Sequence, residues 1–348
     1  MPEDSKPRAV IRRLTDWWDG LPRWGRISLR LLEYGLALWL VFSISGCWFI
    51  THTKRAEVLQ PKLSAEVYDD VEFVSEDGLR LSGWLLKAQQ PLFGAVVCHG
   101  WQMNRMALFD RAMWLYERGG NVLVFDMRAH GRSAGELCSL GHHEVKDVRA
   151  AIGYLTERQL AGEPPRVFLW GHSMGAVACL LAADSESVRG VVAEAPFDNM
   201  TNSIGMFLKS RGHLPPIPLA QSISWMVCRR VGMDDPVDVR PACRRLKDVP
   251  VFLLTGGRDR VVSPFMATRV YESLGGPKRR FVVPEGTHNR LYLMGGEELR
   301  KELAEFLGLP DALRPPGGQI PRTPAPDSEG GRLKSPERGE SPDAERAG

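Results

Sequence analysis

RVFLWGHSMGAVACLLAA, residues 166–183, reads as a short apolar strand, a five-residue turn and an apolar helix. The turn, Gly171 to Gly175, has the pattern G-x-S-x-G. A serine on so sharp a turn between a strand and a helix has a strained backbone and an exposed hydroxyl. The two glycines remove side chains that would collide with the strand and the helix. Ser173 is therefore the candidate nucleophile. The backbone N–H of Met174, at the start of the helix, is a candidate donor to a developing oxyanion.

The alternation of apolar strands and helices continues over most of the chain. Nearly continuous apolar runs lie at residues 94–98, 121–125, 166–170, 190–193, 251–254 and 280–283, with helical stretches at 106–118, 144–158, 176–183 and 264–274. Two further strands, 71–75 and 79–86, flank a hairpin turn at residues 76–78. Continuous apolar runs are typical of parallel strands that helices cover on both faces. We therefore expect an α/β domain over residues 64–309, with a mostly parallel, doubly wound sheet.

Two residues that could activate Ser173 follow predicted strands. A serine hydroxyl is a poor nucleophile until a base removes its proton and an acid orients that base. Asp259 comes after the strand VFLLTGG and His288 after the strand RFVVPEG, in the chain order Ser, Asp, His that this arrangement requires. Both lie at the strand ends where such sheets bind ligands. We expect His288 to be the base and Asp259 its orienting partner.

Plainer roles stay open for these two residues. Asp259 could cap the helix that begins near Pro264, and His288 could be a solvated loop histidine. Asp198 is the weaker alternative acid, and Glu285 would at most support the site from outside.

The loop after the strand at 94–98 should supply a second oxyanion donor. It reads His99-Gly100-Trp101, and Gly100 would let the backbone approach the substrate, so the Trp101 N–H is the candidate. We expect His99 to be structural. The polar turn at residues 126–133 should fix its own loop, with Arg128 and His130 as substrate contacts the less favoured alternative.

These motifs together resemble the α/β-hydrolase superfamily. The resemblance rests on residues 171–175, the His99-Gly100 turn, DMRAHGRS at 126–133, Asp259 with VVSP behind it, and His288. It spans roughly residues 65–309 and is most similar to membrane-anchored, serine-aminopeptidase-like and monoglyceride-lipase-like hydrolases with a short cap. It implies the triad chemistry and a helical cap at residues 197–248, and it leaves the substrate open. Ala129 departs from the glycine often found there, which should not touch catalysis.

The segment that would form the cap is rich in methionine and aromatic residues. These either line an acyl-binding pocket or pack the cap onto the sheet: Met200, Met206, Phe207, Leu208, Trp225 and Met226. Cys228 and Cys243 could pair in an oxidising compartment, whereas Cys98 and Cys179 lie in apolar runs and should be inert. His142-His143-Glu144 has too few partners for a metal site and reads better as a helix start. We expect no metal and no organic cofactor.

The N-terminal part predicts a membrane helix. Residues 34–53 carry no Lys, Arg, Asp or Glu, and a helix of 20 residues is about 30 Å long, the thickness of the hydrocarbon layer. A buried core helix and a cleavable signal peptide are the alternatives, but a signal peptide has a shorter apolar run nearer the start. Seven basic residues precede the span and three follow it within 15 residues. The basic segment 1–33 should therefore stay in the cytoplasm, with the catalytic domain on the other side.

Composition excludes several other classes. The chain has 348 residues, a net charge of +3 and 25% charged residues, which favours neither a nucleic-acid binder nor an acidic disordered protein. Six cysteines without a CxxC pair exclude a disulfide scaffold and a zinc ribbon. Residues 310–348 hold eight of the 25 prolines and little apolar surface, so we expect a disordered tail.

The sequence thus predicts a single-pass membrane serine hydrolase that cleaves an ester, thioester or amide. The anchor and the apolar cap favour lipid or acyl substrates. A peptidase or an acyltransferase with the same triad stays open, and Asp234, Asp235 and Asp238 could serve a peptidase that reads a free N-terminus. A catalytically silent scaffold that presents the tail to a partner is the remaining alternative.

Overall fold

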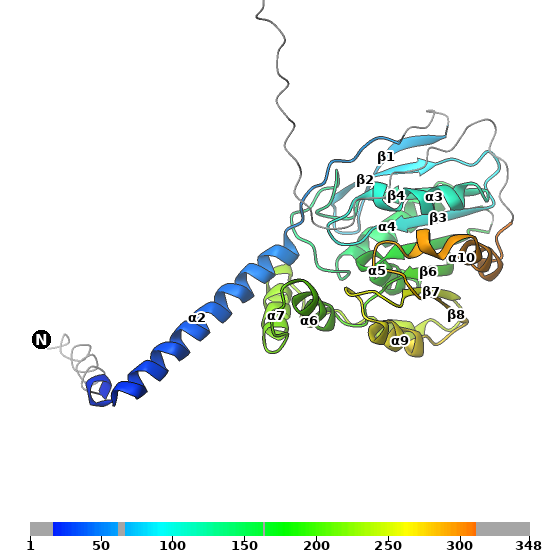
Figure 1. Cartoon of the computed structure of the whole chain (residues 1–348). Helices are drawn as coiled ribbons and strands as arrows, with labels where there is room; N and C mark the ends of the chain where they lie inside the picture. Colours follow the sequence, from blue (N-terminus) through cyan, green and yellow to red (C-terminus); the bar gives the residue numbers. More distant parts are fainter. Residues whose placement is uncertain (1–16, 62–66, 163, 311–348) are drawn as a thin grey trace, which may run out of the picture.

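The computed structural model describes residues 17–61, 67–162 and 164–310. An eight-stranded sheet lies at the centre of this described part, with the strand order β1-β2-β4-β3-β5-β6-β7-β8 (Figure 1). The strands are β1 (Tyr68–Val74), β2 (Arg80–Leu86), β3 (Phe93–Cys98), β4 (Gly120–Phe125), β5 (Val167–His172), β6 (Val188–Glu194), β7 (Val251–Gly256) and β8 (Lys278–Val283). β2 pairs antiparallel with β1 and β4, and the remaining neighbours are parallel. The predicted hairpin and doubly wound sheet are confirmed.

Helices cover both faces of the sheet. Successive residues of a strand point to opposite faces, and each face has its own apolar core. In β3, Val96 and Cys98 join the apolar cluster on one face, and Ala95 and Val97 join the cluster on the other. α4 (Glu144–Glu157), α5 (Met174–Ala182), α8 (Arg240–Arg245) and α9 (Pro264–Ser273) pack on the first face. α3 (Phe109–Tyr116) and α10 (Leu291–Leu307) pack on the second. A strand that is buried on both faces has no polar alternation, which explains the continuous apolar runs.

Two helical segments differ from the sequence prediction. The helix expected at 106–118 is a 3-10 turn, η1 (Arg105–Leu108), followed by the shorter α3. Arg105 is fully buried and held by the Asp126 carboxylate through both its backbone N–H and its guanidinium, which fixes this first turn. α10 was not expected at all. It contains Gly296 with non-helical angles (φ 60, ψ −150), and such a glycine breaks the helical pattern in the sequence.

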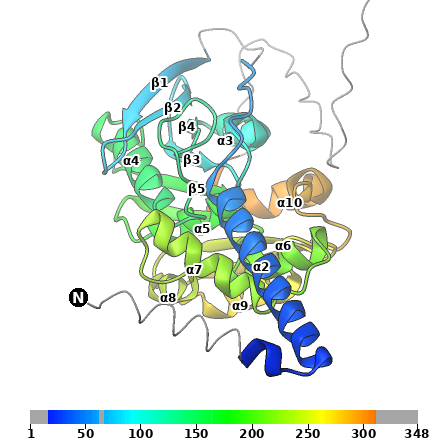
Figure 2. The ribbon, with the colours of Figure 1, turned by 90° about the vertical axis from the view of Figure 1, so that its left-hand side faces the viewer.

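The apolar N-terminal segment forms one long helix, α2 (Arg23–Thr51), which extends away from the sheet (Figures 1 and 2). It begins after Pro22, eleven residues before the charge-free stretch at 34–53, and residues 23–33 contain no proline that would end it. It is the one helix in the described residues that is long and apolar enough to cross a membrane, with a mean hydropathy of 1.6 over its best window. The expected tail at 310–348, beyond Pro310, and residues 1–16 of the basic segment lie outside the described residues.

Two cap helices, α6 (Met200–Arg211) and α7 (Leu219–Val231), follow β6 and lie beside the end of α2 (Figures 1 and 2). The hydroxyls of Ser43 on α2 and Ser222 on α7 are 2.7 Å apart. Gly46 permits the close approach, since a Cβ there would lie 2.6 Å from Ile223 Cδ1. The helix and the cap therefore form one packed unit.

The segment after α2 is tied to the polar turn that follows β4. The Arg55 guanidinium donates hydrogen bonds to the main-chain oxygens of Gly131, Ser133 and Gly135 over 2.6–3.2 Å. Thr53 donates to the main-chain oxygen of Ala129. These contacts fix the chain between the helix and the sheet domain.

Candidate active site

The turn between β5 and α5 holds Ser173 in a conformation that non-glycine residues rarely adopt. Its φ is 52° and its ψ is −114°. A Cβ on Gly171 would lie 2.3 Å from the Gly175 oxygen, and a Cβ on Gly175 would lie 2.3 Å from the Cys98 oxygen. Both glycines are therefore required by backbone contacts, as the G-x-S-x-G pattern predicts.

Three side chains from different strand ends form a hydrogen-bonded chain. His288 Nε2 lies 3.0 Å from Ser173 Oγ, and His288 Nδ1 lies 2.8 Å from Asp259 Oδ2. Because a carboxylate only accepts, Nδ1 carries the hydrogen and Nε2 can accept from the serine hydroxyl. The other Asp259 oxygen accepts from the N–H groups of Val261 and Val262 at 2.8 and 2.9 Å. The carboxylate is thus fixed by two backbone donors and points at the imidazole.

The loop after β3 lies against the serine. A Cβ on Gly100 would lie 3.4 Å from Ser173 Cβ, so the loop that carries Trp101 comes close to the serine. His130 orients this loop: its Nδ1 donates to the Arg128 oxygen at 2.8 Å, so its Nε2 accepts from Gln102 N at 3.2 Å. Met174 follows Ser173 directly and is the first residue of α5. Trp101 and Met174, whose amides stay the predicted oxyanion donors, thus belong to segments that adjoin Ser173.

A buried ion pair between Arg111 and Glu194 lies next to the turn that carries Ser173. The Glu194 carboxylate is fully buried, pairs with Arg111 at 2.8 Å and accepts from Trp170 Nε1 at 3.3 Å. Burial raises the pKa of Glu194, but the Arg111 charge and His172 outweigh it and leave that pKa well below its usual range. Ser173 N donates to the main-chain oxygen of the same Glu194 at 2.8 Å.

His172 connects this pair to the imidazole of the site. Its ring lies 4.9 Å from the His288 ring between centroids, tilted by 52°, and its Nδ1 lies 3.6 Å from the Glu194 carboxylate. Burial lowers the pKa of His172, so its ring is neutral at ordinary pH. No sequence motif points to Glu194, Arg111 or His172, because a buried ion pair across 83 residues leaves no local pattern.

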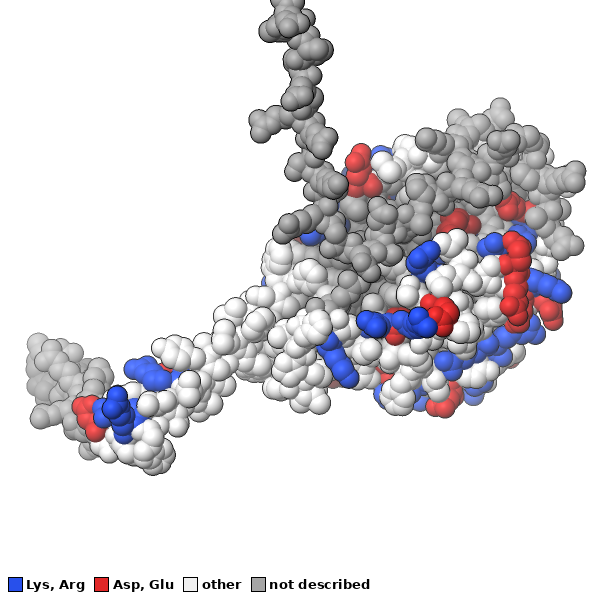
Figure 3. All heavy atoms as spheres, in the orientation of Figure 1, with Lys and Arg blue, Asp and Glu red and all other residues white. Residues whose placement is uncertain are grey.

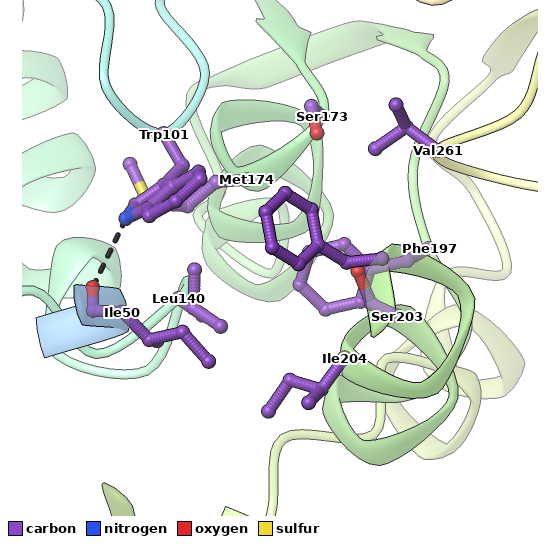
Figure 4. A pocket seen from close by; sticks show the side chains of 10 residues that line it. Ile50, Trp101, Leu140, Ser173, Met174, Phe197, Ser203, Ile204 and Val261 are labelled. Carbon is purple, nitrogen blue, oxygen red and sulfur yellow. Dashed lines mark hydrogen bonds between the residues drawn. The ribbon is translucent and has the colours of Figure 1, made fainter. Parts of the chain in front are cut away.

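An apolar pocket opens beside Ser173 (Figure 4). Its empty volume is about 490 Å³, part of it open to solvent. The lining comes from α2, the loops after β3, β4, β6 and β7, the turn between β5 and α5, and α6: Ile50, Trp101, Leu140, Ser173, Met174, Phe197, Ser203, Ile204, Phe207 and Val261. Figure 4 shows Ile50 and Ile204 on facing sides, at the end of the pocket away from Ser173. Of the cap residues expected to line or pack, Phe207 lines the pocket and Met200 is buried.

Several weaker candidates have other contacts in the structure. Asp198 is fully buried and pairs with Arg269 at 2.9 Å, while Glu285 is exposed and pairs with Arg258. Arg128 is buried between Asp77 and Asp147, which leaves it no path to a substrate. His99 is structural as expected: its Nε2 accepts from Met127 N, and burial lowers its pKa to about 3.

The cysteines and the candidate metal residues are also accounted for. All six cysteines are buried free thiols, so Cys228 and Cys243 do not pair. Burial raises the pKa of Cys243 to about 12, which makes it unreactive. No group of three metal-ligating side chains occurs among the residues that the structure describes. His143 instead precedes the first residue of α4, and its Nε2 donates a hydrogen bond to the main-chain oxygen of Val231.

The match to known proteins agrees with this geometry. Residues 95–305 match the family model described as "Alpha/beta hydrolase family". The chain belongs to this family. The hydrolase is 27% identical to YfhR of Escherichia coli (strain K12) over 248 residues, which cover 69% of this chain and 80% of YfhR. It is 28% identical to YqkD of Bacillus subtilis (strain 168) over 216 residues, which cover 61% of this chain and 70% of YqkD.

Solved structures show the same relationship. The Pyrococcus furiosus esterase Pf2001 has a TM-score of 0.61 and 25% identity, and the match covers 74% of this hydrolase and 97% of the esterase. The α/β hydrolase GrgF of Penicillium sp. sh18 has a TM-score of 0.57 at 22% identity, covering 69% and 97% of the two chains, and supports the fold alone. This α/β hydrolase thus has an esterase among its structural neighbours.

Proposed function

We propose that this α/β hydrolase is a membrane-anchored serine esterase that cleaves lipid or other acyl esters through an acyl-enzyme at Ser173. The observation that carries the proposal is the hydrogen-bonded chain from Asp259 through His288 to Ser173, at the head of an apolar pocket. Serine, base and orienting acid within hydrogen-bond reach are what nucleophilic catalysis needs.

The chemistry follows from the donors and acceptors. His288 Nε2 takes the Ser173 proton as Oγ attacks the ester carbonyl, and it later gives that proton to the leaving alcohol. Asp259 keeps the hydrogen on Nδ1 and stabilises the imidazolium that forms. Water then enters, loses a proton to His288 and releases the acid from Ser173.

The oxyanion of the tetrahedral intermediate would be held by the N–H groups of Met174 and Trp101. Each such donor is worth about 3–4 kcal/mol of barrier lowering in a site that excludes water. The Met174 N–H has the additional support of the α5 N-terminus.

The pocket favours an acyl chain as the group that Ser173 receives. Apart from two serine side chains, the described residues that line it are apolar or aromatic. The Pyrococcus furiosus neighbour is an esterase, which agrees with an ester as the bond cleaved.

The structure of α2 favours a retained anchor over a cleaved signal peptide. Its residues Ser43, Cys47 and Ile50 are buried against the cap, and Ile50 lines the pocket. Cleavage near the end of α2 would remove a wall of the site. In this proposal the N-terminus stays in the cytoplasm and the catalytic domain lies on the other side, because basic residues are in excess before the span.

Acyl transfer to an acceptor other than water is the second candidate. A relative named polyketide transferase, from Stachybotrys chlorohalonatus, is 33% identical over 156 residues, but the match covers only 52% of that protein. The peptidase alternative has less support, because no acidic side chain is found among the described lining residues and Asp238 pairs with Arg240.

The test is Ser173→Ala in the full chain. We expect the variant to lose hydrolysis of p-nitrophenyl esters and labelling by a fluorophosphonate probe. Ser210→Ala, on the cap helix and outside the pocket lining, is the matched control and should behave as wild type. Activity that survives Ser173→Ala would refute the assignment, and a wild type that is neither labelled nor active would favour a silent scaffold. Analysis of products with and without alcohol acceptors separates hydrolysis from transfer.

A further inference from the structure

The contact between α7 and α2 shows how far the cap reaches along α2. Ser43 lies nine residues before His52, which is about 13 Å along a helix axis. Because the Ser43 and Ser222 hydroxyls are 2.7 Å apart, the first turn of α7 lies at the level of Ser43. That level is inside the charge-free stretch of α2, so a membrane around α2 would also surround this turn.

The sequence of α7 changes from uncharged to basic at the same level as α2 does. Residues 214–228 carry no charged side chain, and Arg229 and Arg230 follow. In α2 the uncharged stretch ends near His52, and the Arg230 guanidinium lies 3.4 Å from His52 Nε2. Two segments far apart in the chain thus change character together, which is the pattern of a lipid headgroup layer.

The cap exposes large apolar side chains on the surface next to α2. Ile217 is 72% exposed and Trp225 is 58% exposed. The Arg229 guanidinium lies over the Trp225 ring at 5.8 Å, a pairing suited to the boundary between lipid and water. In Figure 3 the surface of α2 and the adjoining part of the domain is largely uncharged, with basic residues gathered at the far end of the helix.

The pocket lies behind this same surface. Ile50 of α2 and Phe207 of α6 both line it. Phe49, which is 39% exposed, packs on Phe207 at 5.9 Å and on Trp101 at 5.2 Å between ring centroids. An aromatic side chain exposed on the lipid-facing helix is thus in contact with the pocket wall.

We propose that the loop at residues 214–218 and the first turn of α7 lie in the bilayer beside α2, and that the Ser173 pocket takes the acyl chain of its substrate directly from the membrane. The second half rests on the proposed esterase function; the first half rests on α2 as the membrane span and on the geometry above. It commits the surface to lipid rather than to a second protein.

The cationic groups near the loop are compatible with this position. Lys209 is exposed near the end of α6, and Arg211 is the last residue of that helix. A lysine can extend its alkyl stem along apolar surface and keep its ammonium among headgroups. Residues 200–233 contain no Asp or Glu, so no carboxylate opposes the insertion of this loop into the bilayer.

The membrane contact is tested without any use of catalysis. The full chain with Ile217→Cys carries an environment-sensitive nitrobenzoxadiazole label and is reconstituted in vesicles of phosphatidylcholine and phosphatidylglycerol. Val74→Cys is the matched control, since Val74 is also apolar and 62% exposed but lies on β1. The six native thiols are buried, and labelled wild type gives the background.

We expect the label at residue 217 to emit at shorter wavelength than the label at 74, and to be quenched by a lipid with a nitroxide on its acyl chain. Equal emission and equal quenching at the two positions would overturn the proposal. A blue-shifted label that the nitroxide lipid does not quench would mean that protein covers the surface, which also overturns it.

The delivery of substrate is tested with Ile217→Asp, using Val74→Asp as the control. We expect hydrolysis of a long-chain ester embedded in the vesicles to fall about tenfold or more, because a carboxylate opposes insertion. Hydrolysis of water-soluble p-nitrophenyl acetate should be unchanged, because Ile217 does not line the pocket. No change in either substrate, or an equal fall in both, would overturn direct delivery. A wild type without esterase activity would refute the proposed function instead and leave the labelling result in force.

Discussion

The indole Nε1 of Trp101 donates a hydrogen bond to the main-chain oxygen of Ile50 over 3.0 Å. The last carbonyls of a helix lack partners within it, and here a residue of the proposed oxyanion loop supplies one. Gln102, the next residue, supplies another through its Nε2 to the His52 oxygen at 3.3 Å. The end of the apolar helix and the loop beside Ser173 therefore hold each other in place.

Trp101→Phe should lower both the stability of the protein and its rate of ester hydrolysis. The Ile50 oxygen loses its donor, which costs about 1–3 kcal/mol in the free energy of unfolding when the group is buried. Since the loop also carries the Trp101 amide, we expect kcat for p-nitrophenyl esters to fall more than KM rises. Urea unfolding and steady-state kinetics measure the two effects. Trp225→Phe, which touches neither the loop nor the pocket, is the control; equal behaviour of the two variants would contradict the coupling.

Asp259→Asn should lower kcat by about 10⁴-fold, since an amide in this position favours the wrong tautomer of the base. Fluorophosphonate labelling rates at saturating probe report the same loss. Asp248→Asn, at an exposed position, should leave the rate unchanged. Asp198→Asn removes the partner of Arg269 and should lower stability rather than kcat. A larger loss of kcat at Asp198 than at Asp259 would reverse the assignment of the acid.

Glu194→Gln should change the acid dependence of stability. The pKa of Glu194 is lowered in the folded state, so its stabilising contribution is full above its unfolded pKa of about 4.3 and is lost as the pH falls toward the folded value. The difference in unfolding free energy between wild type and variant should therefore shrink below about pH 4.3. Urea unfolding at a series of pH values measures it. Glu186→Gln, an exposed carboxylate, should show no such trend, and a difference that stays constant with pH would argue against an ionised Glu194.

Gly175→Ala should abolish activity, because the new Cβ would lie 2.3 Å from the backbone oxygen of Cys98 and nothing there can move aside cheaply. We expect a poorly folded or inactive protein by circular dichroism and ester hydrolysis. Gly153→Ala is the contrasting variant: the nearest atom to its Cβ is 3.6 Å away, in the middle of α4. That change should raise stability by about 0.5–1 kcal/mol. A fully active Gly175→Ala would show that the turn has another conformation.

Ile204→Trp should shorten the acyl chain that the pocket accepts. Ile204 lies at the end of the pocket away from Ser173, so a larger side chain there fills the distal space and leaves the reacting end free (Figure 4). We expect kcat/KM for long-chain p-nitrophenyl esters to fall while the value for the acetate stays close to wild type. Ile204→Val serves as the conservative control. Equal losses for all chain lengths would mean that acyl groups bind elsewhere.

The sequence predicted the sheet and the proximity of Ser173, Asp259 and His288 because each strand and turn is specified by residues close to it in the chain. Two glycines flank the serine, apolar runs mark buried strands, and the parallel strands bring their carboxyl ends to one edge. The structure places Ser173 and Asp259 each within hydrogen-bond reach of His288, on opposite nitrogens of its ring.

What the sequence missed are contacts between distant segments. Ile50 belongs to a stretch whose composition predicts contact with lipid, and only the packing of α2 on the cap turns one of its faces toward the pocket. Arg111 and Glu194 pair across 83 residues, and His172 contacts the site only because the fold brings its ring beside that of His288. Such contacts depend on tertiary geometry and leave no periodic pattern in the chain.

The three bonds from Arg55 to the backbone between Gly131 and Gly135 bear on how this hydrolase would meet its substrates. A catalytic domain on a flexible linker would move through the aqueous phase, and its rate would depend on the concentration of ester in solution. One that is clamped to its helix keeps a constant height and tilt, so its encounters are set by two-dimensional diffusion. Its rate should then follow the number of ester molecules per unit area of bilayer, and dilution with inert lipid should slow it even when the total amount of ester is unchanged.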